Sequence, residues 1–145
     1  NKGICIFDQK NQTMTCFKNE PANIKSLSGN RVERFYQDSQ GNIWIGTFNN
    51  GLNLFDPKSS SFKRFIPDKS NSYSTRVRSI FENNKGNLFI GTRAGLYLMD
   101  PNKRTFLHYP HGSHEFSILN DNSVQCNFID YTGCLWLGTH AGGVN

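Results

Sequence analysis

The 145-residue sequence predicts an all-β chain built from repeated antiparallel sheets, and three observations lead to this prediction. A seven-residue motif, GNIWIGT at 41–47, returns as GNLFIGT at 86–92 and as GCLWLGT at 133–139. Each copy begins at the end of a four-residue stretch that opens with Asp or Asn and closes with Gly, the composition of a type I turn. No segment has the 3.6-residue apolar period of a helix.

Three further elements keep their spacing in each repeat. A second motif, GLNLFDP at 51–57, matches GLYLMDP at 95–101, and GICIFD at 3–8 is the same motif from an earlier unit. Two aromatic or apolar residues follow its Asp by six and nine positions, and one valine stands nine positions before the glycine of the first motif. Each unit therefore supplies four short strands joined by tight turns.

The strands differ in their expected burial. Residues 42–47 and their copies are continuous apolar runs between glycines, as in a strand that is covered on both faces. The last strand of a unit alternates apolar and polar residues, as an edge strand does. The two complete units predict strands at 32–37, 42–47, 51–56 and 62–66, and at 77–82, 87–92, 95–100 and 105–109.

Four antiparallel strands in about 45 residues are typical of one blade of a β-propeller. We expect a half blade at 1–18, a blade at 31–66, a blade at 76–110 and a half blade at 123–145. This adds up to about three four-stranded antiparallel blades, cut out of phase. Since closed propellers have four to eight blades, the segment is expected to belong to a larger ring or to be completed by association.

The repeat resembles the two-component regulator propeller repeat through Val32, the turn 38–41, Trp44 and the second motif at 51–57. The third unit departs from it with Phe89 in place of Trp. The resemblance implies a non-catalytic sensor region of a hybrid two-component histidine kinase, located in the periplasm and recognising an oligosaccharide. Contact with a membrane is then expected only through other parts of the parent protein.

Composition excludes several other functions. No apolar run approaches the roughly 20 residues that cross a bilayer. The formal net charge is +5, but the 16 Lys and Arg are scattered singly or in pairs, so we do not expect nucleic-acid binding, which needs converging cations. The partners that remain are a saccharide ligand, other propeller blades or a second copy of the chain.

Function is expected where the repeats differ, on loops held by the rigid blades. The loops between the fourth and first strands and between the second and third strands share one face of a propeller and surround its axis. Asn, Arg, His and aromatic side chains there suit a neutral or acidic sugar. The predicted ligand-binding residues are Arg31, Phe48, Asn49, Asn50, Tyr73, Arg76, Arg93 and His140. Trp44, Phe89 and Trp136 are instead interpreted as packing between blades.

Catalysis and metal binding are not expected. His108, His111 and His114 have a regular spacing, but no helix aligns their rings, so we predict no metal site and no cofactor. No catalytic set of Ser, His and Asp can be assembled. The alternatives are a protein-binding propeller scaffold and, since streptogramin-lyase-like propellers also have repetitive blades, a lyase-type enzyme.

The four cysteines show no metal-ligand spacing and lie in apolar stretches, where we expect small buried side chains: Cys5, Cys16, Cys126 and Cys134. Cys5 and Cys16 could face each other across a hairpin. Whether they are bonded stays open, and a disulfide there would require an oxidising compartment.

Overall fold

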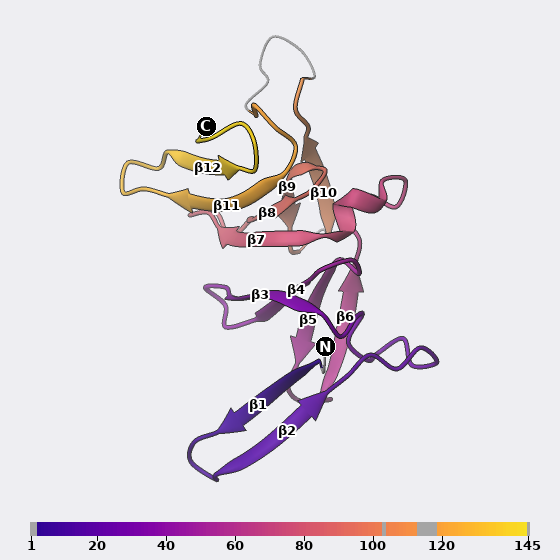
Figure 1. The fold of residues 1–145 in the computed structure, drawn as a ribbon. Helices are drawn as coiled ribbons and strands as arrows, with labels where there is room; N and C mark the ends of the chain where they lie inside the picture. The colour runs from indigo at the N-terminus through magenta and orange to yellow at the C-terminus, as the bar shows by residue number, and fades with distance from the viewer. Residues whose placement is uncertain (1–2, 103, 113–118, 145) are drawn as a thin grey trace.

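The computed structural model describes residues 3–102, 104–112 and 119–144, and this part of the chain is built almost entirely of β-strands (Figure 1). The strands are β1 (Ile4–Asp8), β2 (Thr13–Phe17), β3 (Val32–Gln37), β4 (Ile43–Thr47), β5 (Leu52–Asp56), β6 (Ser61–Phe65), β7 (Val77–Glu82), β8 (Leu88–Thr92), β9 (Gly95–Asp100), β10 (Thr105–Tyr109), β11 (Val124–Ile129) and β12 (Leu135–Thr139). One 3₁₀ turn, η1 (Ser72–Thr75), is the helical element of the described residues.

Each strand pairs with the next one along the chain. The sheets β3-β4-β5-β6 and β7-β8-β9-β10 have four antiparallel strands, and β1-β2 and β11-β12 are two-stranded. The first strands β3, β7 and β11 are neighbours, so they form the inner edge of the stack. The sheets follow one another without closing a ring (Figure 1). The prediction of an all-β propeller segment that begins and ends within a blade is therefore confirmed.

Three hydrophobic clusters hold consecutive sheets together. Ile45 and Phe62 pack with Ile4 of the first hairpin. Trp44 and Phe65 pack with residues of the third sheet. The third cluster joins that sheet to the last one and contains Leu96, Leu119, Val124 and Leu137. Because adjacent residues of one strand enter different clusters, the second strand of a blade is covered on both faces, as its apolar run predicts.

The aromatic position of the repeated motif points toward the following sheet. Trp44 is only 1% exposed because the third sheet covers it. Phe89 packs in the same way against the cluster that contains Leu137. Trp136 is 51% exposed, so the prediction that all three aromatics pack between blades is wrong for this residue. The physical reason is that no described residues form a further sheet beyond β12.

Close approach of the sheets depends on two glycines of the motif. A Cβ on Gly46 would lie 2.6 Å from Cγ1 of Val77 in the next sheet. A Cβ on Gly91 would lie 2.7 Å from Cγ1 of Val124, one sheet further along. The repeated glycine therefore gives room to the repeated valine of the neighbouring blade, which explains why both recur with the same spacing.

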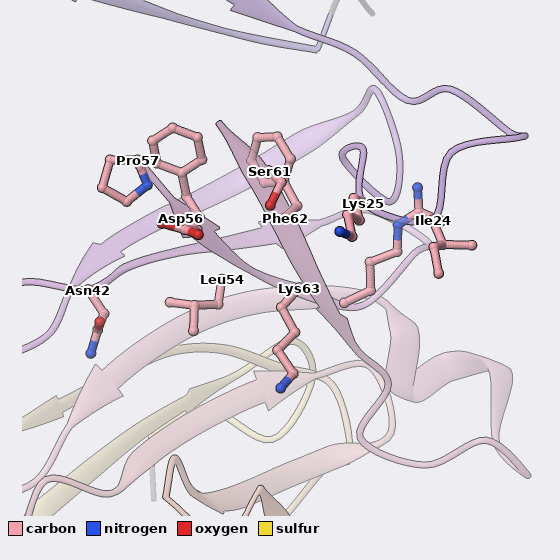
Figure 2. A pocket seen from close by; sticks show the side chains of 11 residues that line it. Ile24, Lys25, Asn42, Leu54, Asp56, Pro57, Ser61, Phe62 and Lys63 are labelled. Carbon is pink, nitrogen blue, oxygen red and sulfur yellow. The ribbon is translucent and has the colours of Figure 1, made fainter. Parts of the chain in front are cut away.

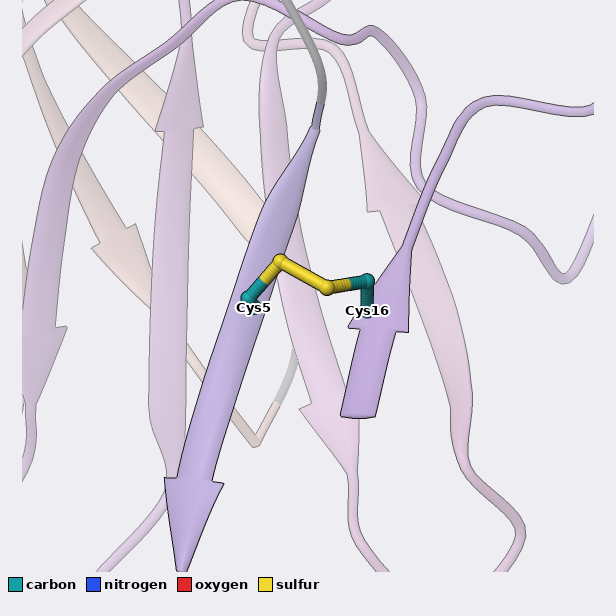
Figure 3. The surroundings of a disulfide bond; sticks show 2 residues. All are labelled: Cys5 and Cys16. Carbon is teal, nitrogen blue, oxygen red and sulfur yellow. A yellow bond between two sulfur atoms is a disulfide. The ribbon is translucent and has the colours of Figure 1, made fainter. Parts of the chain in front are cut away.

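The cysteines depart from the expectation of burial. Cys5 and Cys16 lie opposite each other in the β1-β2 ladder and form a disulfide on an exposed hairpin (Figure 3). Cys126 and Cys134 are exposed free thiols. All four were expected inside because their neighbours are apolar, but the two hairpins that carry them are the outer sheets of the stack. Each of these hairpins has a face that no described sheet covers.

The described residues include no helix with the length and apolar character required to cross a membrane.

Candidate functional site

The two sets of loops chosen from the sequence meet at the inner edge of the stack. The backbone N–H of Phe48, after β4, donates to the carbonyl of Arg31, before β3, over 2.9 Å. The same contact joins His140 to Ser123 in the last sheet, over 3.0 Å. In the third sheet the equivalent residues, Arg76 and Arg93, line the same cavities. The residue before each repeated valine and the residue after each repeated threonine therefore come together on one surface, which we call the inner face. Its loop residues are Arg31, Phe48, Arg76, Arg93, Ser123 and His140.

A β-bulge in each first strand adds a third residue to this surface. The register of the β3-β4 ladder shifts between Val32 and Arg34, which leaves Glu33 as the extra residue. Equivalent shifts occur at Arg78 in β7 and at Gln125 in β11. A bulge redirects the side chain that it carries. Glu33 reaches Arg76, and Arg78 donates from Nη1 to Oε1 of Gln125, so each bulge residue contacts the neighbouring blade.

Phe48 forms the aromatic centre of the inner face. The guanidinium carbon of Arg31 lies 3.5 Å from the centroid of its ring, and that of Arg76 lies 3.8 Å from it. A second stack places Arg93 over Tyr73, at 4.6 Å. Stacking on an aromatic face fixes the plane of a guanidinium and stabilises its charge.

Two cavities open beside these stacks. The first, of about 460 Å³, is lined by Phe48, Asn49, Tyr73, Arg76 and Arg93 together with Ser72 and Thr75. The second, of about 430 Å³, is lined by Arg76, Arg78, Arg93, Asp121, Ser123, His140 and Ala141. Arg76 and Arg93 belong to both, so they form a shared wall. Each cavity has the volume of a small-ligand site.

The structure thus brings six of the predicted binding residues to the cavities and links Arg31 to them through Phe48. Asn50 is the exception: its backbone N–H donates to Oγ1 of Thr47, and its side chain lies against Gly29. It lines neither cavity. Sequence reasoning missed Glu33, Arg78 and Gln125. Their signal was a polar residue that differs between repeats directly after an invariant valine, but a bulge cannot be distinguished from regular alternation in sequence.

Positive charge dominates the inner face. The carboxylate of Glu33 lies 3.7 Å from both Arg31 and Arg76. The carboxylate of Asp121 accepts backbone N–H groups of Ala141 and Ser123, which lower the pKa of this acid. Burial, followed by the nearby charge of Arg76, lowers the pKa of Arg78. The arginines of the two cavities are therefore only partly neutralised by carboxylates.

The regularly spaced histidines do not converge. The ring of His108 stacks on Tyr97 with centroids 4.2 Å apart, and its Nε2 hydrogen bonds to the carbonyl of Ala94. The ring Nδ1 of His111 contacts the carbonyl of Leu119. His114 lies outside the described residues. Among the described residues no group of three His, Cys, Asp or Glu side chains is arranged to hold a metal ion.

A larger cavity of about 750 Å³ lies on the outer strands of the second sheet (Figure 2). Leu54 pairs with Lys63 and Phe55 with Phe62, so these neighbouring pairs project from opposite faces of the β5-β6 hairpin. The cavity therefore wraps around the hairpin. Its Arg64 is engaged by the carbonyl of Ser26 and by neighbouring backbone. Its lining contains one arginine and none of the arginine–aromatic stacks of the inner face.

Comparisons with known proteins support the repeat. Residues 26–49 match the family model described as the two component regulator propeller. No protein with curated annotation matches the chain significantly.

The solved structures that are similar to the chain include the following two. One is the extracellular domain of BT4673 from B. thetaiotaomicron, described both as a one component and as a hybrid two component system, with 20% identity and a TM-score of 0.50 over 99% of this chain and 24% of that one. The other is PorZ, a surface component of the type-IX secretion system of Porphyromonas gingivalis, with 17% identity and a TM-score of 0.67 over 94% and 20%. The chain therefore spans less than a quarter of these structures, and at such identities the likeness shows the fold.

Proposed function

We propose that the chain is a non-catalytic, ligand-sensing propeller segment of an extracytoplasmic two-component sensor, and that it binds an oligosaccharide at the inner face. The observation that carries this proposal is the convergence of Arg76, Arg93, Phe48, Tyr73 and His140 on two adjoining cavities. They come from three successive repeats. Planar cations and aromatic rings in such an arrangement can bind hydroxyl or acidic groups and the C–H faces of sugar rings.

The repeat and the fold agree with a sensor. The segment that matches the two component regulator propeller model ends at Asn49, within a predicted binding loop. BT4673, which has the same fold, is described as the extracellular domain of a two component system. In such a sensor, ligand binding favours one arrangement of the protein by its differential affinity, without chemistry on the ligand.

The disulfide supports a location outside the cytoplasm. The Cys5–Cys16 bond lies on an exposed hairpin, where cytosolic reductants would reach it. Disulfides of this kind persist in oxidising compartments such as the periplasm.

Retention on a glycan array tests the proposal. We expect one group of arrayed oligosaccharides to retain the purified chain. The same oligosaccharides, incubated with the chain in solution, should be recovered unchanged, as mass spectrometry would show. The variants Tyr73→Ala and Phe48→Leu should reduce retention, because they remove the aromatic parts of the stacks. Turnover of the sugar would favour a lyase-type enzyme. If no sugar on the array retains the chain, and the chain specifically captures a polypeptide, a protein-binding scaffold would be favoured.

The open ends of the stack also lead to a proposal about partners. Trp44 occupies its motif position under a covering sheet, whereas Trp136 and the neighbouring Phe128 are about half exposed in the last sheet. We propose that another propeller sheet covers them, from the rest of the parent ring or, for the isolated segment, from a second copy. The exposed aromatic surface is of the kind that associates in water.

A further inference from the structure

We infer that the inner face selects an anionic ligand, namely a saccharide that carries carboxylate or sulfate groups. This inference rests on the proposed function and names the substrate class of the same site. The residues that would select such groups are Arg76, Arg78 and Arg93, which together line the second cavity. Arg76 and Arg93 also line the first.

Three guanidinium groups lie together there because they occupy positions that the repeat brings to the inner face. Arg76 precedes the valine of β7, Arg78 follows it on the bulge, and Arg93 follows the threonine of β8. The corresponding residues of the last sheet are Ser123, Gln125 and His140. The arginines therefore belong to one blade and are not a requirement of the repeat.

The hydrogen-bonding capacity of these arginines is only partly used within the chain. The buried Nε atoms of Arg76 and Arg78 have no hydrogen-bond partner among the described residues. Burial of an unpaired polar group costs free energy, and like charges close together add to that cost. Lowering of the pKa of Arg78 by burial and by Arg76 has the same origin. An anion in the cavity would relieve the repulsion that the folded chain otherwise bears.

The carboxylates nearby do not remove the attraction of these arginines for an anion. Glu33 is shared between Arg31 and Arg76 at 3.7 Å, longer than a charge-assisted hydrogen bond. Asp121 is occupied by two backbone N–H groups. Arg93 is exposed at the rim, stacked on Tyr73, and has no carboxylate partner among the described residues. A stacked arginine at a cavity rim is suited to planar recognition of a carboxylate or a sulfate.

Matched pairs of saccharides test the inference. The full chain would be measured on a dilution-series array with trigalacturonate and its methyl ester, and with a sulfated galactan tetrasaccharide and its desulfated form. In each pair the ring and linkages stay the same while the charge is removed. We expect an acidic member to retain the chain at least ten-fold more strongly than its neutral partner. The pair that shows this difference identifies carboxylate or sulfate as the group that is recognised.

Two variants connect the preference to the cavity. Arg93→Gln and Arg78→Gln should each lower retention of the acidic probe about ten-fold, the effect of losing one charge-assisted hydrogen bond. Lys85→Gln is the charge-matched control, because Lys85 is exposed on the turn between β7 and β8 and lines neither cavity. If Arg78→Gln does not fold, as judged by circular dichroism, the exposed Arg93 still decides.

The outcomes separate the inference from the proposed function. Neutral members retained as strongly as acidic ones would overturn the inference and leave saccharide sensing intact. An acidic preference that Lys85→Gln lowers as much as Arg93→Gln would overturn it as well, since general charge would then explain it. If none of the four probes retains the chain while neutral oligosaccharides elsewhere on the array do, the inference alone is overturned. If no oligosaccharide on the array retains it, both are contradicted.

Discussion

The indole Nε1 of Trp44 donates a hydrogen bond of 2.8 Å to Oδ2 of Asp38, across the turn that joins β3 to β4. The other oxygen of this carboxylate accepts the backbone N–H groups of Gln40 and Asn42. Asp130 and Trp136 repeat the pair at 2.9 Å in the last sheet. One aspartate therefore closes the turn and also fixes the aromatic side chain that packs toward the next blade.

The third sheet shows what happens without the indole donor. Phe89 replaces the tryptophan, and the turn position is held by Asn83, whose Oδ1 accepts the N–H groups of Lys85 and Asn87. Asp with Trp and Asn with Phe are thus two matched solutions. A carboxylate without the indole would lose a donor, while an amide keeps the turn bonds without a charge.

We predict that Trp44→Phe lowers the free energy of unfolding by about 1–3 kcal/mol, because it removes a buried hydrogen bond and leaves a cavity. The double variant with Asp38→Asn should lose less free energy of unfolding than the sum of the two single variants, since the pair then has the composition of Asn83 and Phe89. Urea denaturation in a double-mutant cycle measures this coupling. Trp136→Phe, at a half-exposed position, is the control and should cost less. Strict additivity would argue against the matched pairs.

The repeats allowed the strand order to be predicted, because glycine, valine and turn residues have fixed spacings that one architecture explains. Eight loop residues were predicted to bind the ligand, and the cavities collect most of them. The bulge residues Glu33 and Arg78 were missed, since the period of two does not reveal an extra residue. The exposure of Trp136 and Cys126 could not be predicted either, because burial depends on whether another sheet covers a strand, whereas local apolarity is the same in every repeat.

Acid should destabilise the fold through its turn carboxylates. The hydroxyl of Thr132 and then the indole of Trp136 hold the pKa of Asp130 at about 2. In the unfolded chain the pKa of an aspartate is about 3.9, so ionisation of Asp130 favours the folded state. This contribution is complete above the unfolded pKa and is lost as the pH falls from about 4 to about 2. The pKa of Asp8 is lowered in the same sense by Asn11.

We therefore predict that the urea midpoint is constant above about pH 5 and falls steeply below about pH 4. Asp130→Asn should make this fall shallower, because the asparagine cannot take up the proton. Glu20→Gln controls for the loss of one carboxyl group outside these turns. An unchanged acid profile in Asp130→Asn would contradict the assignment.

The hairpin disulfide should stabilise the first sheet. Cys5 and Cys16 are separated by 11 positions, and closing a loop of this size in the unfolded chain contributes about 2–3 kcal/mol. We expect Cys5→Ser with Cys16→Ser to lower stability by about this amount and to increase amide exchange in β1 and β2 above that of β7.

Thiol labelling provides an independent measurement. Without reductant, a maleimide should modify two cysteines, Cys126 and Cys134, and after reduction in denaturant it should modify four. Peptide mapping would identify the sites. Four labelled cysteines without reductant, in protein isolated under oxidising conditions, would contradict the bond.

The two ends of the stack should make the isolated segment associate. Ile6, Phe7 and Met14 on the first hairpin and Phe128 and Trp136 on the last sheet are 43–65% exposed, whereas the aromatic of the equivalent inner position, Trp44, is buried. We expect sedimentation velocity to show a concentration-dependent dimer or larger species, and Phe128→Lys with Trp136→Lys to shift it toward monomer. Tyr131→Lys is the control, because Tyr131 lies fully exposed at the tip of the β11-β12 turn, away from a sheet face. A compact monomer at every concentration, for the native and the double-variant protein alike, would contradict this prediction and show that the end sheets are stable when exposed to water.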